Sequence, residues 1–363
     1  MMKNCPSCNS SKMRKYEFHQ QEVDQCQACH GIWLELGELD GALSVADNGN
    51  SQVYMEETLG EILGESKCHC HVCDKKLSRY HLMSGFEVEV DTCSSCYGVW
   101  LDHEELEKVS QSPAIAKALL ELDKPVHKRT WLFQFLSQMP VEYNLKPKRT
   151  PWVTYALLVF NVLIFMSYGL GGSSEDFAFN NFALHSDQVS HGQQLWTLLT
   201  HMYMHGGLMH LVGNMYFLYI IGDNLEDTLG RGKFILYYTL CGLGAAVAQI
   251  LADPNSMIPM VGASGAIAGL FGMYLLWFRH ASLTFMIIVY QKKVSPVIFF
   301  GFWILTNILG LYLANESGGG VAYWAHIGGF IAGIAIGLLV KKKVFAANPL
   351  LAILNSHEVK VKR

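Results

Sequence analysis

Residues 321–343 read VAYWAHIGGFIAGIAIGLLVKKK, and this stretch decides the fold class. An α-helix needs about 20 mostly apolar residues to cross the hydrocarbon core of a bilayer, and here such a run ends in three lysines. Its glycines, Gly329, Gly333 and Gly337, recur at every fourth residue, a spacing that lets helix backbones approach closely in membranes. His326 is costly in such a segment, because polar groups inside spans need partners. The stretch predicts a membrane-spanning helix that holds a functional polar group.

Five other apolar segments have a comparable length. The six predicted spans are residues 152–168, 203–222, 234–251, 262–279, 296–314 and 321–340. Gly and polar residues interrupt several of them, so these spans are expected to face protein rather than lipid. The pattern predicts an all-α polytopic membrane protein with a bundle of six transmembrane helices.

The composition divides the chain into two unlike parts. Hydrophobic residues make up 51% and charged residues 16% of the 363 residues, whereas soluble domains carry roughly 25% charge. Residues 1–150 hold 22 acidic and 16 basic residues, and residues 151–363 hold only 9 and 11. The first part is typical of a soluble acidic module and the second of a membrane domain. Collagen-like, disordered and strongly basic nucleic-acid-binding proteins are excluded.

Basic residues lie in alternate connections between the spans. These are Lys146, Lys148, Arg149, Arg231, Lys233, Arg279, Lys292, Lys293, Lys341, Lys342 and Lys343. The other connections, residues 169–201, 252–261 and 315–320, contain no Lys or Arg. The positive-inside rule therefore predicts that both termini and the acidic module are cytoplasmic, and an even number of spans agrees.

Nine of the ten cysteines lie before residue 100. Eight form four C-x-x-C pairs: Cys5 and Cys8, Cys26 and Cys29, Cys70 and Cys73, and Cys93 and Cys96. Two such pairs complete a tetrahedral four-cysteine site, so the spacing predicts two structural zinc ions. Disulfides and redox-active pairs are the alternatives. The sequence enters this module without an apolar leader, so we expect a reducing compartment, which favours metal.

Three further potential ligands lie near the second site. Cys68, His69 and His71 precede or interrupt its first pair. One of them could be an alternative ligand of the second ion, but we interpret all three as solvent-exposed residues outside the site.

The cysteine module is an internal repeat. VDQCQACHGIWLE at residues 23–35 aligns with VDTCSSCYGVWLD at residues 90–102. Units this small bury little core, so the metal is expected to stabilise them. In each repeat the Trp is expected to pack over the metal site, and a short helix to follow at about 35–45 and 102–110.

These repeats resemble zinc ribbons of the transcription factor B type, over residues 5–40 and 70–107. Ribbons of this kind bind nucleic acid in some proteins and protein in others. Because the module is acidic, strong phosphate binding is not expected. The acidic charge thus favours a cytoplasmic protein partner over nucleic acid.

Polar residues of three predicted spans fall at one depth. The topology places His210 and Asn214 in the outer half of the second span, Ser264 about one turn into the fourth and His326 about one turn into the sixth. A Ser and a His at equal depth can form a nucleophile and its general base. His210 and Asn214, four residues apart on one helical face, could donate to an oxyanion together with the backbone N–H of Ser264.

Residues 150–340 resemble the rhomboid intramembrane serine proteases. The resemblance rests on H-x-x-x-H-x-x-x-x-H-L-V-G-N at residues 201–214, on G-A-S-G at residues 262–265 and on A-H-I-G-G at residues 325–329. It implies that Ser264 is the nucleophile, His326 the general base, and His210 and Asn214 the oxyanion-hole side chains. It also implies catalysis without a cofactor.

The chain departs from the family pattern at two places. Trp196 is followed by Thr197 where many members have Arg, and Glu226 is followed by Asp227-Thr228 where a Glu-x-Arg pattern is common. Both places concern structural bracing rather than chemistry. His201 and His205 have no assigned role, and packing or loop hydrogen bonding is favoured over chemistry.

The function expected from the resemblance is a serine endopeptidase that cleaves transmembrane proteins within the lipid bilayer near its extracytoplasmic side. We expect it in a bacterial inner membrane. One alternative is a catalytically silent rhomboid-like protein that binds membrane proteins. A metalloprotease using His201, His205 and His210 would lack the Glu of an H-E-x-x-H motif, and a transporter would lack a charged residue in mid-span.

The predicted organisation has five parts. They are a first zinc ribbon (1–45), a second ribbon (66–110), a linker (111–150), the six-span domain (151–341) and a cytoplasmic tail (342–363). The linker contains an amphipathic stretch at residues 131–136, which either touches the membrane surface or forms a solvated helix.

Overall fold

The computed structural model describes residues 4–10, 13–39, 59–83, 85–112, 140–143, 149–169, 171–287, 290–314 and 320–356, with the single positions 42, 115, 134, 147 and 359. The chain divides into two compact units. One combines Met1–Lys124 with Pro349–Lys362, and the other is Pro125–Asn348. The amphipathic stretch at 131–136 and most of the helix predicted at 35–45 lie outside the described residues.

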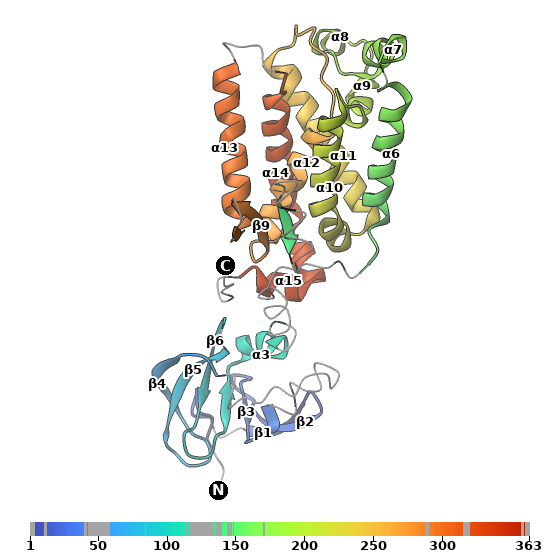
Figure 1. Cartoon of the computed structure of the whole chain (residues 1–363). Coiled ribbons are helices and arrows are strands. Elements are labelled where there is room, and N and C mark those ends of the chain that lie inside the picture. The colour runs from blue at the N-terminus through green and yellow to red at the C-terminus, as the bar shows by residue number, and fades with distance from the viewer. Residues whose placement is uncertain are drawn as a thin grey trace. The chain divides into compact units, whose positions relative to one another are not determined.

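The cysteine-rich unit is built on a single sheet (Figure 1). Its seven strands are β1 (Met13–Phe18), β2 (Gln21–Cys26), β3 (Ile32–Leu34), β4 (Ile62–His69), β5 (Lys76–Met83), β6 (Phe86–Thr92) and β7 (Val99–Leu101), in the order β1-β2-β3-β7-β6-β5-β4. The two repeats join where β3 pairs with β7, with Trp33 opposite Trp100. The sequence predicted two ribbons but not their union into one antiparallel sheet.

The two tryptophans pack across the junction between the repeats. A methyl group at Gly31 would overlap the ring of Trp100, and one at Gly98 would overlap the ring of Trp33. Each ribbon thus covers the glycine turn of the other, and both rings are buried among the cysteines. Both tryptophans thus lie beside the cysteine clusters, as predicted. The sequence did not predict that each ring also packs on the other repeat and so ties the two ribbons together.

Helix α3 (His103–Ser110) follows the second ribbon where the sequence predicted a helix. Asp102 and Glu105 form a capping box at its start, with the Asp102 backbone N–H donating to Glu105 Oε2 at 3.0 Å. Such boxes satisfy the free amides of a first turn.

The C-terminal segment belongs to the same unit as the ribbons. Helix α15 (Pro349–Leu354) buries Leu354 in the apolar core formed by the sheet and α3, and Leu350 and Ile353 pack beside it. Val359 forms an antiparallel bridge with Phe86 of β6. The segment predicted as a tail, 342–363, is therefore divided between the last long helix and this packed segment.

The second unit is a helical bundle (Figure 1). Its long helices are α6 (Trp152–Tyr168), α10 (Leu208–Leu229), α11 (Arg231–Ala252), α12 (Ser264–Trp277), α13 (Pro296–Ala314) and α14 (Tyr323–Ala347). Among the described residues, α11, α13 and α14 are long and apolar enough to cross a membrane, and α6 and α12 are shorter apolar helices. Helix α10 carries Asp223, Glu226 and Asp227 toward its end. The count of six spans stays a prediction.

Short elements at the two ends of the bundle were not predicted. At one end lie α7 (Ser173–Phe182), α8 (Ser186–Ser190), α9 (Thr197–Thr200) and the 3₁₀ turn η1 (His201–Tyr203), and at the other a sheet of β8 (Val141–Tyr143), β9 (Ser282–Ile287) and β10 (Tyr290–Val294) (Figure 1). This sheet and the ribbon sheet correct the all-α class. Helix α10 starts at Leu208, not at residue 203, because η1 and the pair Gly206-Gly207 interrupt the helix.

Glycines hold α12 and α14 in direct backbone contact. A methyl group at Gly329 would overlap the carbonyl oxygen of Gly265, and one at Gly333 would overlap that of Gly269. Only glycine, which has no Cβ atom, fits at such a crossing. This is the reason small residues recur at close helix interfaces. This seam fixes the starts of the two helices beside each other.

Glu226 of α10 braces the start of α6. Its carboxylate accepts hydrogen bonds from the backbone N–H groups of Val153 and Thr154, at 3.0 and 2.7 Å, and from Thr154 Oγ1 at 2.9 Å. The first amides of a helix lack partners within it, and a carboxylate there also suits the helix dipole. Glu226 therefore has the bracing role expected of it.

We predict that Gly333→Ala disrupts the bundle, because the added methyl group meets backbone rather than a movable side chain. Overpacking of this kind costs about 1–3 kcal/mol or more, measurable as a lower midpoint of thermal unfolding in detergent. Gly301→Ala on α13 is the control, since a methyl group there meets nothing within 4 Å. Equal midpoints for the two variants would contradict the backbone contact between α12 and α14.

We also predict that Leu354→Ala destabilises the ribbon unit, because Leu354 is 7% exposed in its core. Such a truncation costs about 2–5 kcal/mol. Amide hydrogen exchange in β6 and β7 of the full chain should become faster. Leu36→Ala, at a residue 66% exposed in the same unit, should leave the exchange unchanged. Unaltered exchange in Leu354→Ala would show that the C-terminal segment does not stabilise the ribbons.

Candidate functional site

Ser264 and His326 meet at the starts of two helices. Ser264 is the first residue of α12, rather than lying one turn into it, and His326 lies in the first turn of α14. His326 Nε2 is 2.8 Å from Ser264 Oγ. Both residues are partly buried. This is hydrogen-bond distance for a nucleophile and its base, so proton transfer between the two atoms needs no rearrangement.

His326 also contacts a residue that the sequence reasoning missed. Its Nδ1 is 2.6 Å from Oδ1 of Asn307 on α13, and Asn307 is 6% exposed. The signal that could have found Asn307 was an amide in the middle of an apolar span, where polar groups need partners.

His210 lies beside the same loop as Ser264. A methyl group at Gly262 would lie 2.8 Å from His210 Nε2 and 3.5 Å from Ser264 Oγ. Gly262 has φ +125°, and its N–H donates to the His201 carbonyl at 2.9 Å. A glycine is therefore needed both for the backbone conformation and for the approach of the imidazole.

The tautomer of His210 follows from its other nitrogen. The N–H of Gly206 donates to His210 Nδ1 at 3.3 Å, so Nδ1 acts as acceptor and Nε2 carries the hydrogen of the neutral ring. The nitrogen beside Gly262 is thus the donor. A donor at this position suits an anion that develops near Ser264.

Asn214 shares the helical face of His210, as predicted. Its Nδ2 donates to the His210 carbonyl at 3.0 Å, and the side chain is buried. The structure therefore places His210, Ser264 and His326 around one loop, whereas the hydrogen bond of Asn214 is to its own helix.

His201 and His205 are buried and serve the fold around this loop. His201 Nδ1 is 2.7 Å from the Thr197 carbonyl. The His205 ring packs against the His210 ring at a centroid distance of 5.2 Å. Tyr168 holds the His205 backbone, because its hydroxyl accepts from the N–H at 2.6 Å and donates to the carbonyl at 3.0 Å.

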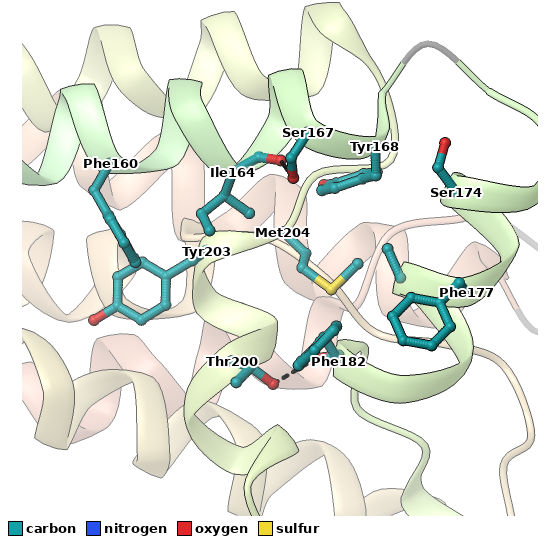
Figure 2. Close-up of a pocket in the computed structure, with 11 residues that line it drawn as sticks. Phe160, Ile164, Ser167, Tyr168, Ser174, Phe177, Phe182, Thr200, Tyr203 and Met204 are labelled. Carbon is teal, nitrogen blue, oxygen red and sulfur yellow. Dashed lines mark hydrogen bonds between the residues drawn. The ribbon is translucent and has the colours of Figure 1, made fainter.

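An apolar cavity of about 410 Å³ lies between α6, α7 and the segment that holds Thr200 and Met204. Figure 2 shows Phe177 and Phe182 on one side of it and Ile164 with Tyr203 on the other. None of the residues that line it is Ser264, His326 or His210. We place the candidate site at Ser264 and His326, since the cavity lacks comparable reactive groups.

Eight cysteines of the ribbon unit form two clusters that could each hold a metal ion. They are Cys5, Cys8, Cys26 and Cys29 in the first, and Cys70, Cys73, Cys93 and Cys96 in the second. Sulfur–sulfur distances of 3.2–3.6 Å separate neighbours within them. Four sulfurs at about 2.3 Å from one Zn²⁺ would lie about 3.8 Å apart. The geometry thus fits an ion and is too long for S–S bonds of about 2.05 Å.

The ribbon backbone favours the thiolate of one cysteine in each cluster, whereas burial raises the pKa of four others, namely Cys5, Cys29, Cys70 and Cys96. Burial works against the charged form of Cys26, but the N–H groups of Cys29 and Ala28 outweigh it and lower its pKa to about 7. The pKa of Cys93 is about 7 for the same reasons, with Cys96 and Ser95 as donors. Thiolates are the form that binds zinc.

The three extra candidates near the second site lie outside both clusters. Cys68 is buried, which corrects its prediction as exposed, and its N–H donates to Ser66 Oγ at 3.1 Å. The His71 side chain is only 2% exposed, which corrects its prediction as exposed too, and its Nδ1 is 3.1 Å from the Asn4 carbonyl of the first ribbon. His69 is exposed.

The histidine metal site considered from the sequence is not formed. Among the described residues, the only groups of three or more potential ligands with donor atoms within 4.8 Å of one another are the two cysteine clusters. His201, His205 and His210 therefore do not form a metal site.

Comparison with protein families identifies both parts of the chain. Residues 192–343 match the rhomboid domain, and residues 4–45 and 69–112 match the transcription factor zinc-finger family. The chain contains a rhomboid domain and two zinc ribbons. The rhomboid match includes the segments with His210, Ser264, Asn307 and His326 and begins after α6.

Individual relatives are similar to the rhomboid part. RHOMBOID-like protein 6, mitochondrial, of Arabidopsis thaliana is 33% identical over 159 residues, which cover 44% of this chain and 48% of the relative. RHOMBOID-like protein 2 of the same plant is 35% identical over 159 residues, covering 44% of this chain and 46% of the relative. The matched part spans about half the length of these plant proteins.

A bacterial relative carries a protease name. Rhomboid protease GluP of Bacillus subtilis (strain 168) is 29% identical over 189 residues, covering 52% of this chain and 35% of the relative. The resemblance found from the sequence motifs is thus confirmed for the rhomboid domain and for the ribbons.

We predict that Cys73→Ser removes one of two bound zinc ions, because it takes one sulfur from a four-cysteine cluster. Elemental analysis of the purified chain measures this. Cys68→Ser is the matched control, since Cys68 is a neighbouring buried cysteine outside the cluster. Loss of metal in the Cys68 variant, or two ions retained in the Cys73 variant, would contradict the assignment.

Proposed function

We propose that this chain is an intramembrane serine endopeptidase that cleaves transmembrane segments of membrane proteins near the extracytoplasmic side. The observation that carries the proposal is the 2.8 Å distance between Ser264 Oγ and His326 Nε2, within the segment that matches the rhomboid domain. The protease name of a relative supports the same chemistry.

Acylation follows from this pair. Ser264 Oγ attacks the carbonyl carbon of the scissile peptide bond, and its proton passes to His326 Nε2. The tetrahedral intermediate then collapses, the C–N bond breaks, and His326 returns the proton to the leaving amine. An ester of Ser264 remains.

We propose three kinds of donor for the oxyanion, of which the Asn214 amide would have to leave its present hydrogen bond to the His210 carbonyl. They are Nε2 of His210, the side-chain amide of Asn214 and the first backbone amides of α12. The amides at a helix start have no partner within the helix and favour negative charge. Removing one such donor costs about 10²–10³-fold in kcat in other serine proteases. The partial exposure of Ser264 supports access of the water that hydrolyses the ester.

The substrate must present an extended peptide bond. A transmembrane helix shields its amides in internal hydrogen bonds, so residues that destabilise its outer end should favour cleavage. We propose a six-span topology with both termini cytoplasmic, from the placement of Lys and Arg. Localisation in a bacterial inner membrane stays a prediction, and the matched relatives come from a plant and a bacterium.

The zinc ribbons are proposed to hold two structural zinc ions and to dock a cytoplasmic protein. Their fold supports a structural role for the metal, because the tryptophans and the junction of β3 with β7 join two cysteine clusters into one sheet. Zinc takes no part in the proposed chemistry. The ribbons would then alter substrate choice or assembly rather than the reaction.

We predict that Ser264→Ala abolishes cleavage of a single-span model substrate in liposomes, with a fall of at least about 10³-fold. Cleavage is measured with the full chain by gel analysis of the substrate fragments. Ser167→Ala on α6 is the control, because Ser167 is exposed and its hydroxyl donates to the Ile164 carbonyl of its own helix. It should cut at the rate of the natural chain.

Two outcomes would overturn the proposal. Normal cleavage by Ser264→Ala would remove Ser264 from the chemistry. No cleavage by the natural chain of any single-span substrate with a destabilised outer end would favour the catalytically silent binding protein.

A further inference from the structure

A buried amide on α13 adjoins the proposed dyad. Asn307 Oδ1 lies 2.6 Å from His326 Nδ1, on the side of the imidazole opposite Ser264. The nitrogen of the same amide donates to the Trp303 carbonyl, one turn earlier, at 2.8 Å. The three side chains Ser264, His326 and Asn307 therefore form one hydrogen-bonded chain that draws on three different helices.

The second hydrogen bond of Asn307 fixes which atom faces His326. If the amide were reversed, its oxygen would face the Trp303 carbonyl, and two acceptors would oppose each other in a buried place. An unsatisfied buried acceptor costs roughly 1–3 kcal/mol. The oxygen thus faces Nδ1, and Nδ1 must carry the hydrogen.

This choice determines what the other nitrogen can do. A neutral imidazole with hydrogen on Nδ1 has its lone pair on Nε2. Nε2 is the atom 2.8 Å from Ser264 Oγ, so it is ready to accept the hydroxyl proton. With the hydrogen on Nε2 instead, His326 would donate to Ser264 and could not act as its base.

The same contact acts after the proton has moved. His326 then bears a positive charge with Nδ1–H directed at an amide oxygen, and a dipole aimed at a new charge is effective where water is scarce. A carboxylate would do this more strongly, but an ionised side chain within a span is costly. Trp303 adds a steric limit, because its ring lies 5.6 Å from the His326 ring between centroids.

We propose that Asn307 is a positioning residue, which holds His326 in the orientation and tautomer that activate Ser264. The inference rests on the proposed function, since it assigns a role within the same reaction. It extends the pair found from the sequence to a Ser–His–Asn arrangement whose third member comes from α13.

The test compares three variants of the full-length chain in liposomes with one model substrate. Asn307→Leu keeps a side chain of similar size but removes the acceptor. Asn307→Asp restores an acceptor to Nδ1–H. Asn161→Leu is the matched control, because Asn161 is also buried and its Nδ2 bonds to the carbonyl four residues earlier, at 2.7 Å, on α6.

We expect Asn307→Leu to lower kcat by about 10- to 100-fold, a part of the about 10²–10⁴-fold that a general base contributes. KM should stay within about two-fold, because Asn307 touches no substrate in this scheme. The kcat of Asn307→Asp should be at least about ten-fold higher than that of Asn307→Leu, because the carboxylate again accepts the hydrogen bond from Nδ1–H. Thermal unfolding should be alike for Asn307→Leu and Asn161→Leu.

The failures of the two proposals are distinguishable. If Ser264-dependent cleavage is present but Asn307→Leu matches Asn161→Leu in kcat, the positioning role is wrong and the proposed function stands. A kcat for Asn307→Asp no higher than for Asn307→Leu also overturns the role. If the natural chain shows no Ser264-dependent cleavage, the proposed function fails, and this inference fails with it.

Discussion

The bundle depends on backbone contact between α12 and α14. Gly329 lies against the Gly265 carbonyl and Gly333 against that of Gly269, so any side chain at these points would separate the two helices. Ser264 and His326 stand at the starts of the same helices, and their 2.8 Å separation requires this approach. Glycines thus replace larger side chains where α12 and α14 cross. The close approach of the two helices makes the short contact between Ser264 and His326 possible inside an apolar bundle.

A different constraint organises the ribbon unit. Cysteine clusters and two exchanged tryptophans join the ribbons on one side of the unit, and a separate apolar core packs beside them. The exchange makes each ribbon incomplete without the other, as the overlap of Trp33 with Gly98 shows. The C-terminal segment completes the apolar side through Leu354. The unit that holds the metal sites therefore includes both ends of the chain.

Features encoded by local spacing were predictable from the sequence. The C-x-x-C pairs, α3, and the bounds of α6 and α13 follow from residues close in the chain. The pairing of Ser264 with His326 was inferable because basic residues set the depth of each span. The Trp exchange, the sheet of β8 with β9, and the contact of Asn307 with His326 depend on which distant segments meet. Periodicity and composition carry no such information.

The most direct test of the account is to locate the nucleophile by covalent labelling. The full-length chain is reacted with a serine-directed fluorophosphonate in liposomes, and the modified peptide is identified by mass spectrometry. The account predicts one adduct, on Ser264, because an imidazole nitrogen of His326 is placed to take the proton of that hydroxyl, and predicts its loss in His326→Ala. No adduct, an adduct on another residue, or equal labelling of His326→Ala would contradict it.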